Sequence, residues 1–170
     1  MAFVKSAADE LVAVVNAPGS VADKRPKLRR IVDANVDVEE IGRFCLARFW
    51  RSATPEQQKQ YLELFHSVML NNVAGKLGEY QGVRVTISRS QIRDDTEVVS
   101  STVERPNNPP TIVDWVVGSP TTRPKIIDVV AEGTSMRLTQ RSDYAAYLAR
   151  NNGNVQALID ALRQQTTRLG

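Results

Sequence analysis

The spacing of the apolar residues changes near Gly82, and this change constrains the fold more than any other feature of the sequence. Before Gly82, apolar residues recur every three or four positions, which is typical of amphipathic helices. From Val83 to about residue 132 they alternate with polar residues, as in half-buried strands. Helical spacing returns after Gly133. This order of helices, strands and helices predicts an α+β fold, and we expect residues 1–170 to form one domain.

Four runs with alternating pattern are expected to form strands, at residues 83–87, 97–104, 111–118 and 125–132. The links between the later runs, 106–110 and 119–124, are short and rich in proline, asparagine or serine, which favours turns. Short links between consecutive strands favour antiparallel pairing. We therefore predict a four-stranded antiparallel meander packed against a cluster of helices, with Gly133 ending the sheet.

Capping signals predict where several helices begin and end. Thr-Pro-Glu-Gln at 54–57 offers a threonine cap, a proline in the first turn and a returning glutamine, and it predicts a long helix to about Glu79. Earlier helices are expected over 7–17 and through the basic run to Asn35, and Asp37 can cap a third. The third helix is expected to carry one apolar stripe, formed by Val38, Ile41, Cys45 and Phe49. Asn154 is expected to cap the last helix.

A basic run, Lys-Arg-Pro-Lys-Leu-Arg-Arg at 24–30, stands out in a chain whose formal net charge is only +3. One interpretation is a solvated helix face; another is that Lys27, Arg29 and Arg30 dock on an anionic partner or membrane surface. No aromatic residues interleave these charges, so the run lacks the stacking signature of nucleic-acid binding.

The sequence contains little that suggests catalysis, and we expect neither a catalytic residue nor a metal or cofactor. His66 is the only histidine and Cys45 the only cysteine, which rules out a histidine cluster and an internal disulfide. Asp114 and Asp128 lie within predicted strands and could serve as acids or bases, or as structural carboxylates. The apolar stripes could close as a solid core or around an apolar cavity, and an enzyme using Asp128 or His66 and a partner-binding module both remain alternatives.

Several short segments, in order, resemble the MlaC family, also called the toluene-tolerance auxiliary component. The matching segments are Ile-Gly-Arg-Phe at 41–44, Phe-Trp at 49–50 and the helix start at 54–57. The clearest one is Asp-Val-Val-Ala-Glu-Gly-Thr-Ser at 128–135, where the family shows a D-V-x-x-E-G-x-S run. The similarity extends over residues 5 to 165. Arg123-Pro124 and Thr134 depart from the family, which usually has a tryptophan and an aliphatic residue there, and residues 138–144 also resemble its hopanoid-associated branch.

The resemblance implies a periplasmic carrier that encloses a phospholipid in an apolar cavity and is not an enzyme. Its partners would be the MCE-domain subunit of an inner-membrane ABC transporter and an outer-membrane lipoprotein complex, and its signal peptide would lie outside this sequence. The hopanoid-associated branch would imply a polycyclic lipid as the cargo instead. The residues expected to line the cavity are Ile41, Phe44, Phe65, Val68, Met69, Val73, Leu77, Val99, Val103, Val113, Trp115, Val117, Ile127, Val129 and Tyr144.

Overall fold

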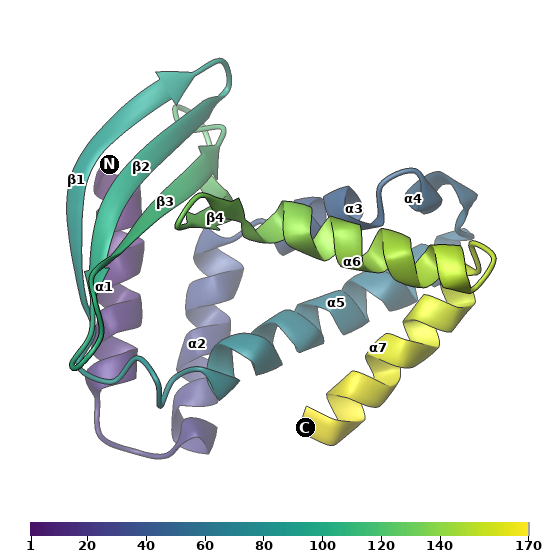
Figure 1. Cartoon of the computed structure of the whole chain (residues 1–170), viewed down its shortest axis with the longest axis horizontal. Helices are drawn as coiled ribbons and strands as arrows, with labels where there is room; N and C mark the ends of the chain where they lie inside the picture. Colours follow the sequence, from purple (N-terminus) through teal and green to yellow (C-terminus); the bar gives the residue numbers. More distant parts are fainter. Residues whose placement is uncertain (170) are drawn as a thin grey trace. The chain divides into compact units, whose positions relative to one another are not determined.

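The computed structural model describes residues 1–169, and its helices and strands follow the predicted order (Figure 1). The elements are α1 Ala2–Asn16, α2 Val21–Asn35, α3 Val38–Leu46, α4 Phe49–Ser52, α5 Pro55–Gly75, β1 Arg84–Arg93, β2 Thr96–Glu104, β3 Thr111–Gly118, β4 Lys125–Ala131, β5 Thr134–Ser135, α6 Met136–Arg150 and α7 Val155–Leu169. No helix within 1–169 is both long enough and apolar enough to cross a membrane.

The chain folds into two compact units, each built from two separate stretches of sequence. The first unit consists of Met1–Asp37 and Val73–Met136, and it contains α1, α2 and the sheet. The second unit consists of Val38–Asn72 and the chain from Arg137 onward, and it is helical.

The sheet of the first unit has the strand order β1-β2-β3-β4-β5, and every neighbouring pair is antiparallel. The antiparallel meander and the α+β class are therefore confirmed, with one strand more than predicted. Gly133 does not end the sheet, because Glu132 and Gly133 both have positive φ, 53° and 82°, and form a tight turn into β5.

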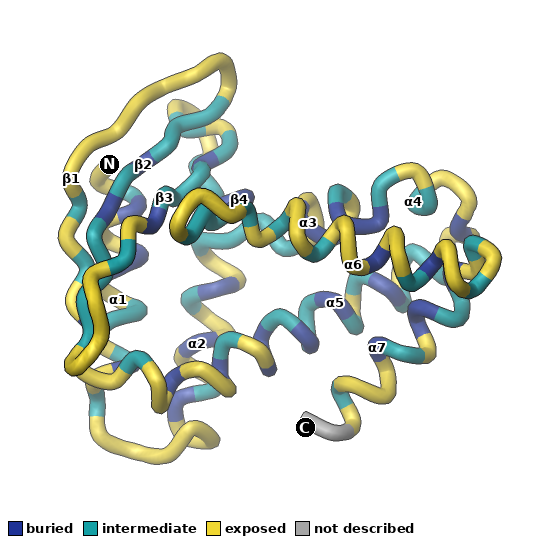
Figure 2. Tube along the Cα trace, viewed as in Figure 1, coloured by how far each residue is buried: buried dark blue, intermediate teal, exposed yellow. Residues whose placement is uncertain are grey.

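The two faces of the sheet differ sharply in composition. On the apolar face, Val99 pairs with Trp115, and Trp115 pairs with Val129. On the polar face, Ser100 lies between Arg89 and Asp114. In the middle of the sheet burial follows the same division, because Val99 is completely buried whereas Ser100 is half-buried and Arg89 is exposed. The second half of β1 is exposed on both faces (Figure 2).

Helix α1 packs on the apolar face and supplies part of the core of the first unit. Val4 of α1 is buried against Val99 and Val117. A second cluster joins Val15 of α1 and Leu28 of α2 to Ala74 in the last turn of α5 and to Leu77 and Val83, which lie between α5 and β1. In Figure 1, α1 accordingly runs along the sheet behind the strands.

The core of the second unit is organised around the completely buried Tyr61 of α5. Its hydroxyl donates a 2.6 Å hydrogen bond to the Gly42 carbonyl of α3, and its ring contacts Phe65 and Tyr144. A Cβ at Gly42 would lie 3.1 Å from the Phe65 ring, so glycine allows this close approach.

Several predicted boundaries are wrong, each for a local reason. Helix α5 begins after the predicted cap, where Thr54 and Gln57 exchange hydrogen bonds, but it ends at Gly75 rather than near Glu79. Gly75 and Gly78 weaken its last turns, and residues 76–80 form tighter turns. The apolar stripe of the third helix breaks at Ala47, whose φ is 54°, so Phe49 belongs to α4.

Candidate functional site

In the first unit, the apolar face of the sheet holds most of the residues predicted to line a cavity. Val113 and Val117 are buried, and Val117 contacts Val4 of α1. Trp115 is half-buried, and its indole Nε1 donates to the Ser101 Oγ at 2.9 Å. The Ser101 Oγ in turn donates to the Val113 carbonyl at 2.8 Å. A satisfied polar pair thus lies within an otherwise apolar surface.

The remaining predicted residues of the first unit lie beside this surface. Val73 and Val103 are half-buried and pack against the cluster that contains Leu77. Ile127 is buried, at a register shift where β3 and β4 pair irregularly, and Val129 is half-buried. The predicted residues of this unit are therefore brought together on one side of the sheet or in the adjoining cluster.

The second unit gathers the other predicted residues along α3, α5 and α6. Phe65 and Tyr144 are buried and their rings lie 6.5 Å apart, and Ile41 and Val68 are also buried. Phe44 is half-buried, with the guanidinium groups of Arg137 and Arg141 at 4.3 and 4.9 Å from its ring centre. Met69 is half-buried as well.

Two tyrosines introduce hydroxyls into this apolar interior. Burial is the main cause that raises the pKa of Tyr61 well above its usual range, and the nearby Tyr144 adds to the effect. The pKa of Tyr144 is also raised, mainly by burial and to a smaller extent by Cys45. Both hydroxyls are therefore neutral at physiological pH. The interior of this unit presents aliphatic carbon, aromatic rings and uncharged oxygen, which suits contact with hydrocarbon.

Of the side chains considered for acid–base chemistry, Asp128 is held by hydrogen bonds within the first unit. Asp128 is buried, and its Oδ2 accepts a 2.5 Å hydrogen bond from the Ser135 hydroxyl while its Oδ1 accepts from the Val129 amide. These bonds hold the carboxylate against β5. Within the described part of the chain, no group of three or more histidine, cysteine, aspartate or glutamate side chains could hold a metal ion.

Comparison with known proteins decides the family. The model of the MlaC protein family matches residues 5–164. The chain belongs to the MlaC family. The structure also resembles that of a phospholipid-binding protein from Ralstonia solanacearum, solved in complex with a phospholipid. The two chains are 27% identical, the match covers 99% of this chain and 97% of that one, and the TM-score is 0.84. The predicted family is thus confirmed over nearly the whole chain.

The basic run divides into buried and exposed residues in this MlaC-family chain. Lys24 is buried, and its Nζ donates to the Val15 carbonyl at the end of α1. Lys27, Arg29 and Arg30 are exposed on α2, and Arg29 lies 3.8 Å from Asp33 in a surface ion pair. Such surface pairs contribute little to stability.

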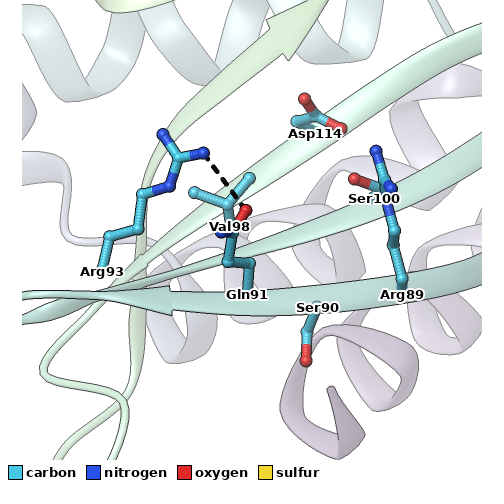
Figure 3. Close-up of a pocket in the computed structure, with 7 residues that line it drawn as sticks. All are labelled: Arg89, Ser90, Gln91, Arg93, Val98, Ser100 and Asp114. Carbon is cyan, nitrogen blue, oxygen red and sulfur yellow. Dashed lines mark hydrogen bonds between the residues drawn. The ribbon is translucent and has the colours of Figure 1, made fainter.

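Sequence reasoning missed one feature of the MlaC-family chain, a pocket of about 490 Å³ on the polar face of the sheet (Figure 3). Its lining residues are Arg89, Ser90, Gln91, Arg93, Val98, Ser100 and Asp114. Of these, the sequence pattern singles out only Asp114. It misses the four β1 residues because residues 88–91 are all polar and predict a first strand that stops at Ile87, whereas β1 continues to Arg93.

Proposed function

We propose that this protein is a carrier that binds a phospholipid and moves it between membranes. The observation that carries this proposal is the close structural similarity, over 99% of the chain, to a protein solved with a bound phospholipid. Membership of the MlaC family supports the same function.

Elementary energetics explains why such a carrier must enclose its cargo. Moving a methylene from an apolar site to water costs about 0.8 kcal/mol, so a chain of about 15 methylenes costs on the order of 12 kcal/mol. A dry apolar site removes this barrier without any reacting group. The protein would therefore act by binding and release, which agrees with the structural hydrogen bonds of Asp128.

We further propose that the fifteen predicted apolar residues contact the acyl chains. Those of the first unit lie on the apolar face of the sheet and in the adjoining cluster, away from Asp114 and Asp128. Those of the second unit lie on α3, α5 and α6 and include the neighbouring rings of Phe65 and Tyr144. They are mostly aliphatic, and aliphatic side chains offer dispersion contacts to hydrocarbon with no competing polar atoms.

The proposal also concerns the membranes and partner proteins that the carrier serves. A periplasmic carrier of this kind would receive or deliver lipid at the MCE-domain subunit of an ABC transporter and at an outer-membrane lipoprotein complex. The exposed cations Lys27, Arg29 and Arg30 would dock on an acidic surface of one of these partners.

Native mass spectrometry of the purified protein tests the carrier function directly. We expect a mass above that of the bare chain, with a phospholipid recovered unchanged in an organic extract. A polycyclic lipid in the extract would keep the carrier function but replace the cargo. A bare chain with no extractable lipid, even after incubation with phospholipid vesicles, would contradict the proposal.

Charge reversal tests the docking surface. Replacing Lys27, Arg29 and Arg30 with glutamate should slow lipid transfer several-fold at low salt while the bound lipid is retained, because the exposed charges would act mainly on association. The difference should shrink as ionic strength rises. A matched control replaces the exposed Arg51, Lys59 and Arg150 with glutamate, which changes the net charge equally. Equal transfer rates for both triple variants would indicate that the basic run is only a solvated helix face.

A further inference from the structure

The pocket on the polar face of the sheet combines opposite charges that do not neutralise each other (Figure 3). Arg89, Gln91 and Arg93 come from β1, and Asp114 comes from β3. None of the pocket's residues is among those proposed to contact acyl chains. Any ligand of this pocket therefore has a site of its own, and its binding does not depend on the proposed lipid cargo.

Asp114 carries a buried oxygen without a hydrogen-bond partner. Among the described residues, its Oδ1 is the buried side-chain oxygen or nitrogen atom that has no hydrogen-bond partner. A buried acceptor left unpaired is destabilising, and such groups are uncommon in native proteins. By contrast, Asp128 of the neighbouring strand β4 has both oxygens bonded. Asp114 thus offers a carboxylate to a donor that the protein itself does not supply.

The arginines on the other side of the pocket present donors to an anion. Arg89 and Arg93 are exposed, and within residues 1–169 Arg93 donates only to the uncharged Gln91 amide oxygen, at 3.2 Å. Arg84 of the same strand differs, because it lies 4.0 Å from the Glu104 carboxylate across the strand pair. A guanidinium group without a carboxylate partner is well suited to bind phosphate.

The register of the strands sets the distance between the two charges. Arg89 pairs with Ser100, and Ser100 pairs with Asp114, so the arginine and the aspartate lie two strands apart. This separation is about 9–10 Å at the backbone. Figure 3 shows the Arg89 and Asp114 side chains on the same side of the sheet, with Ser100 between them. A ligand that bridges Arg89 and Asp114 therefore needs a negative and a positive group that are held apart by a short linker.

We propose that this pocket binds a phosphoethanolamine group, with the phosphate at Arg89 and Arg93 and the ammonium at Asp114. The phosphate offers several oxygens to two guanidinium groups, and the ammonium supplies the donor that the Asp114 Oδ1 lacks. The two-carbon linker separates the charges further than the single carbon of an α-amino acid. Val98 beside Gln91 gives the linker an apolar contact.

Binding of small probes to the purified full chain, measured by calorimetry or NMR titration, tests the proposal. Phosphoethanolamine should bind more tightly than ethyl phosphate, which lacks the ammonium. Asp114→Asn should weaken phosphoethanolamine binding about ten-fold or more and change ethyl phosphate binding less than two-fold. Arg89→Gln should weaken both. Asp95→Asn and Arg84→Gln are matched controls outside the pocket and should change neither.

Two results would overturn this assignment. One is equal affinity for phosphoethanolamine and ethyl phosphate in the unsubstituted protein, including no binding of either. The other is an Asp114→Asn variant, folded by circular dichroism, that binds phosphoethanolamine as before.

A second measurement identifies the source of the group. If it belongs to a lipid headgroup, vesicles of phosphatidylethanolamine and phosphatidylglycerol should bind the protein more tightly than vesicles of phosphatidylglycerol alone, and Asp114→Asn should remove the difference. If the ligand is a free solute, the small probe binds and the vesicles show no such difference. Both results support the pocket, and both are independent of lipid carried in the apolar interior.

Discussion

The two faces of the sheet are made by alternate residues of the same strands, yet they have opposite properties. Val99 and Val117 lie on the apolar face and are buried under α1. Ser100, which follows Val99 in β2, and Asp114, which pairs with Ser100 across the strands, belong to a pocket with two arginines. The comparison shows that one short meander can pack an apolar core on one side and present a pocket with charged side chains on the other. A register slip of one residue would exchange the two roles.

The largest expected effect separates the faces by stability. Val99→Asp should lower the free energy of unfolding by about 3 kcal/mol or more, because it places an unpaired carboxylate in a fully buried apolar site. Ile112→Asp on the polar face, where the side chain is 58% exposed, should change it by less than about 1 kcal/mol. Urea denaturation measures both. Similar losses would mean that the polar face is covered in solution.

Two adjacent serines give a finer version of the same test. Ser101→Ala should cost about 1–3 kcal/mol, because the Trp115 Nε1 loses its acceptor within the apolar face. Ser100→Ala on the polar face should be close to neutral. The intrinsic fluorescence of Trp115 should shift only for Ser101→Ala, and an equal response to both substitutions would place the serines in similar surroundings.

Substitution of Asp114 should increase the free energy of unfolding rather than lower it. Asp114→Val should raise the free energy of unfolding by about 1 kcal/mol, since it removes a buried unpaired oxygen and places a β-branched residue in the centre of a strand. Thermal unfolding of the ligand-free protein measures this gain. A loss of stability would show that Asp114 stabilises the folded chain, and it would weaken the case for a ligand there.

One substitution should change stability little but should strongly reduce the amount of lipid that is carried. Val73→Trp should leave melting of the delipidated protein within about 1 kcal/mol of normal and sharply reduce lipid occupancy, because its ring would fill space used by an acyl chain. Phosphoethanolamine binding should be unaffected. Asn72→Trp is the matched control, since Asn72 is exposed on the same helix. A destabilised Val73→Trp variant that still carries lipid would place Val73 in a solid core.

The family and the fold class could be predicted because they depend on patterns that are local in the sequence. The cap of α5 closes within residues 54–57, where Thr54 and Gln57 bond to each other, and Asn154 bonds to the amide of Gln156 at the start of α7. The alternation of apolar and polar residues in β2 and β3 likewise separates Val99 from Ser100 on the basis of sequence alone. Short-range hydrogen bonds and side-chain periodicity need no information from distant residues.

Tertiary pairing decided what these patterns left open. Residues 88–93 are mostly polar, and they form a strand because residues 96–100 of β2 supply their hydrogen-bond partners. Residues 134–135 become β5 only by pairing with β4. Lys24 belongs to a basic run, yet it is buried because the end of α1 offers it a carbonyl. The pocket that joins Arg89 to Asp114 exists for the same reason: strand register, set by partners distant in sequence, brings the two charges to one face.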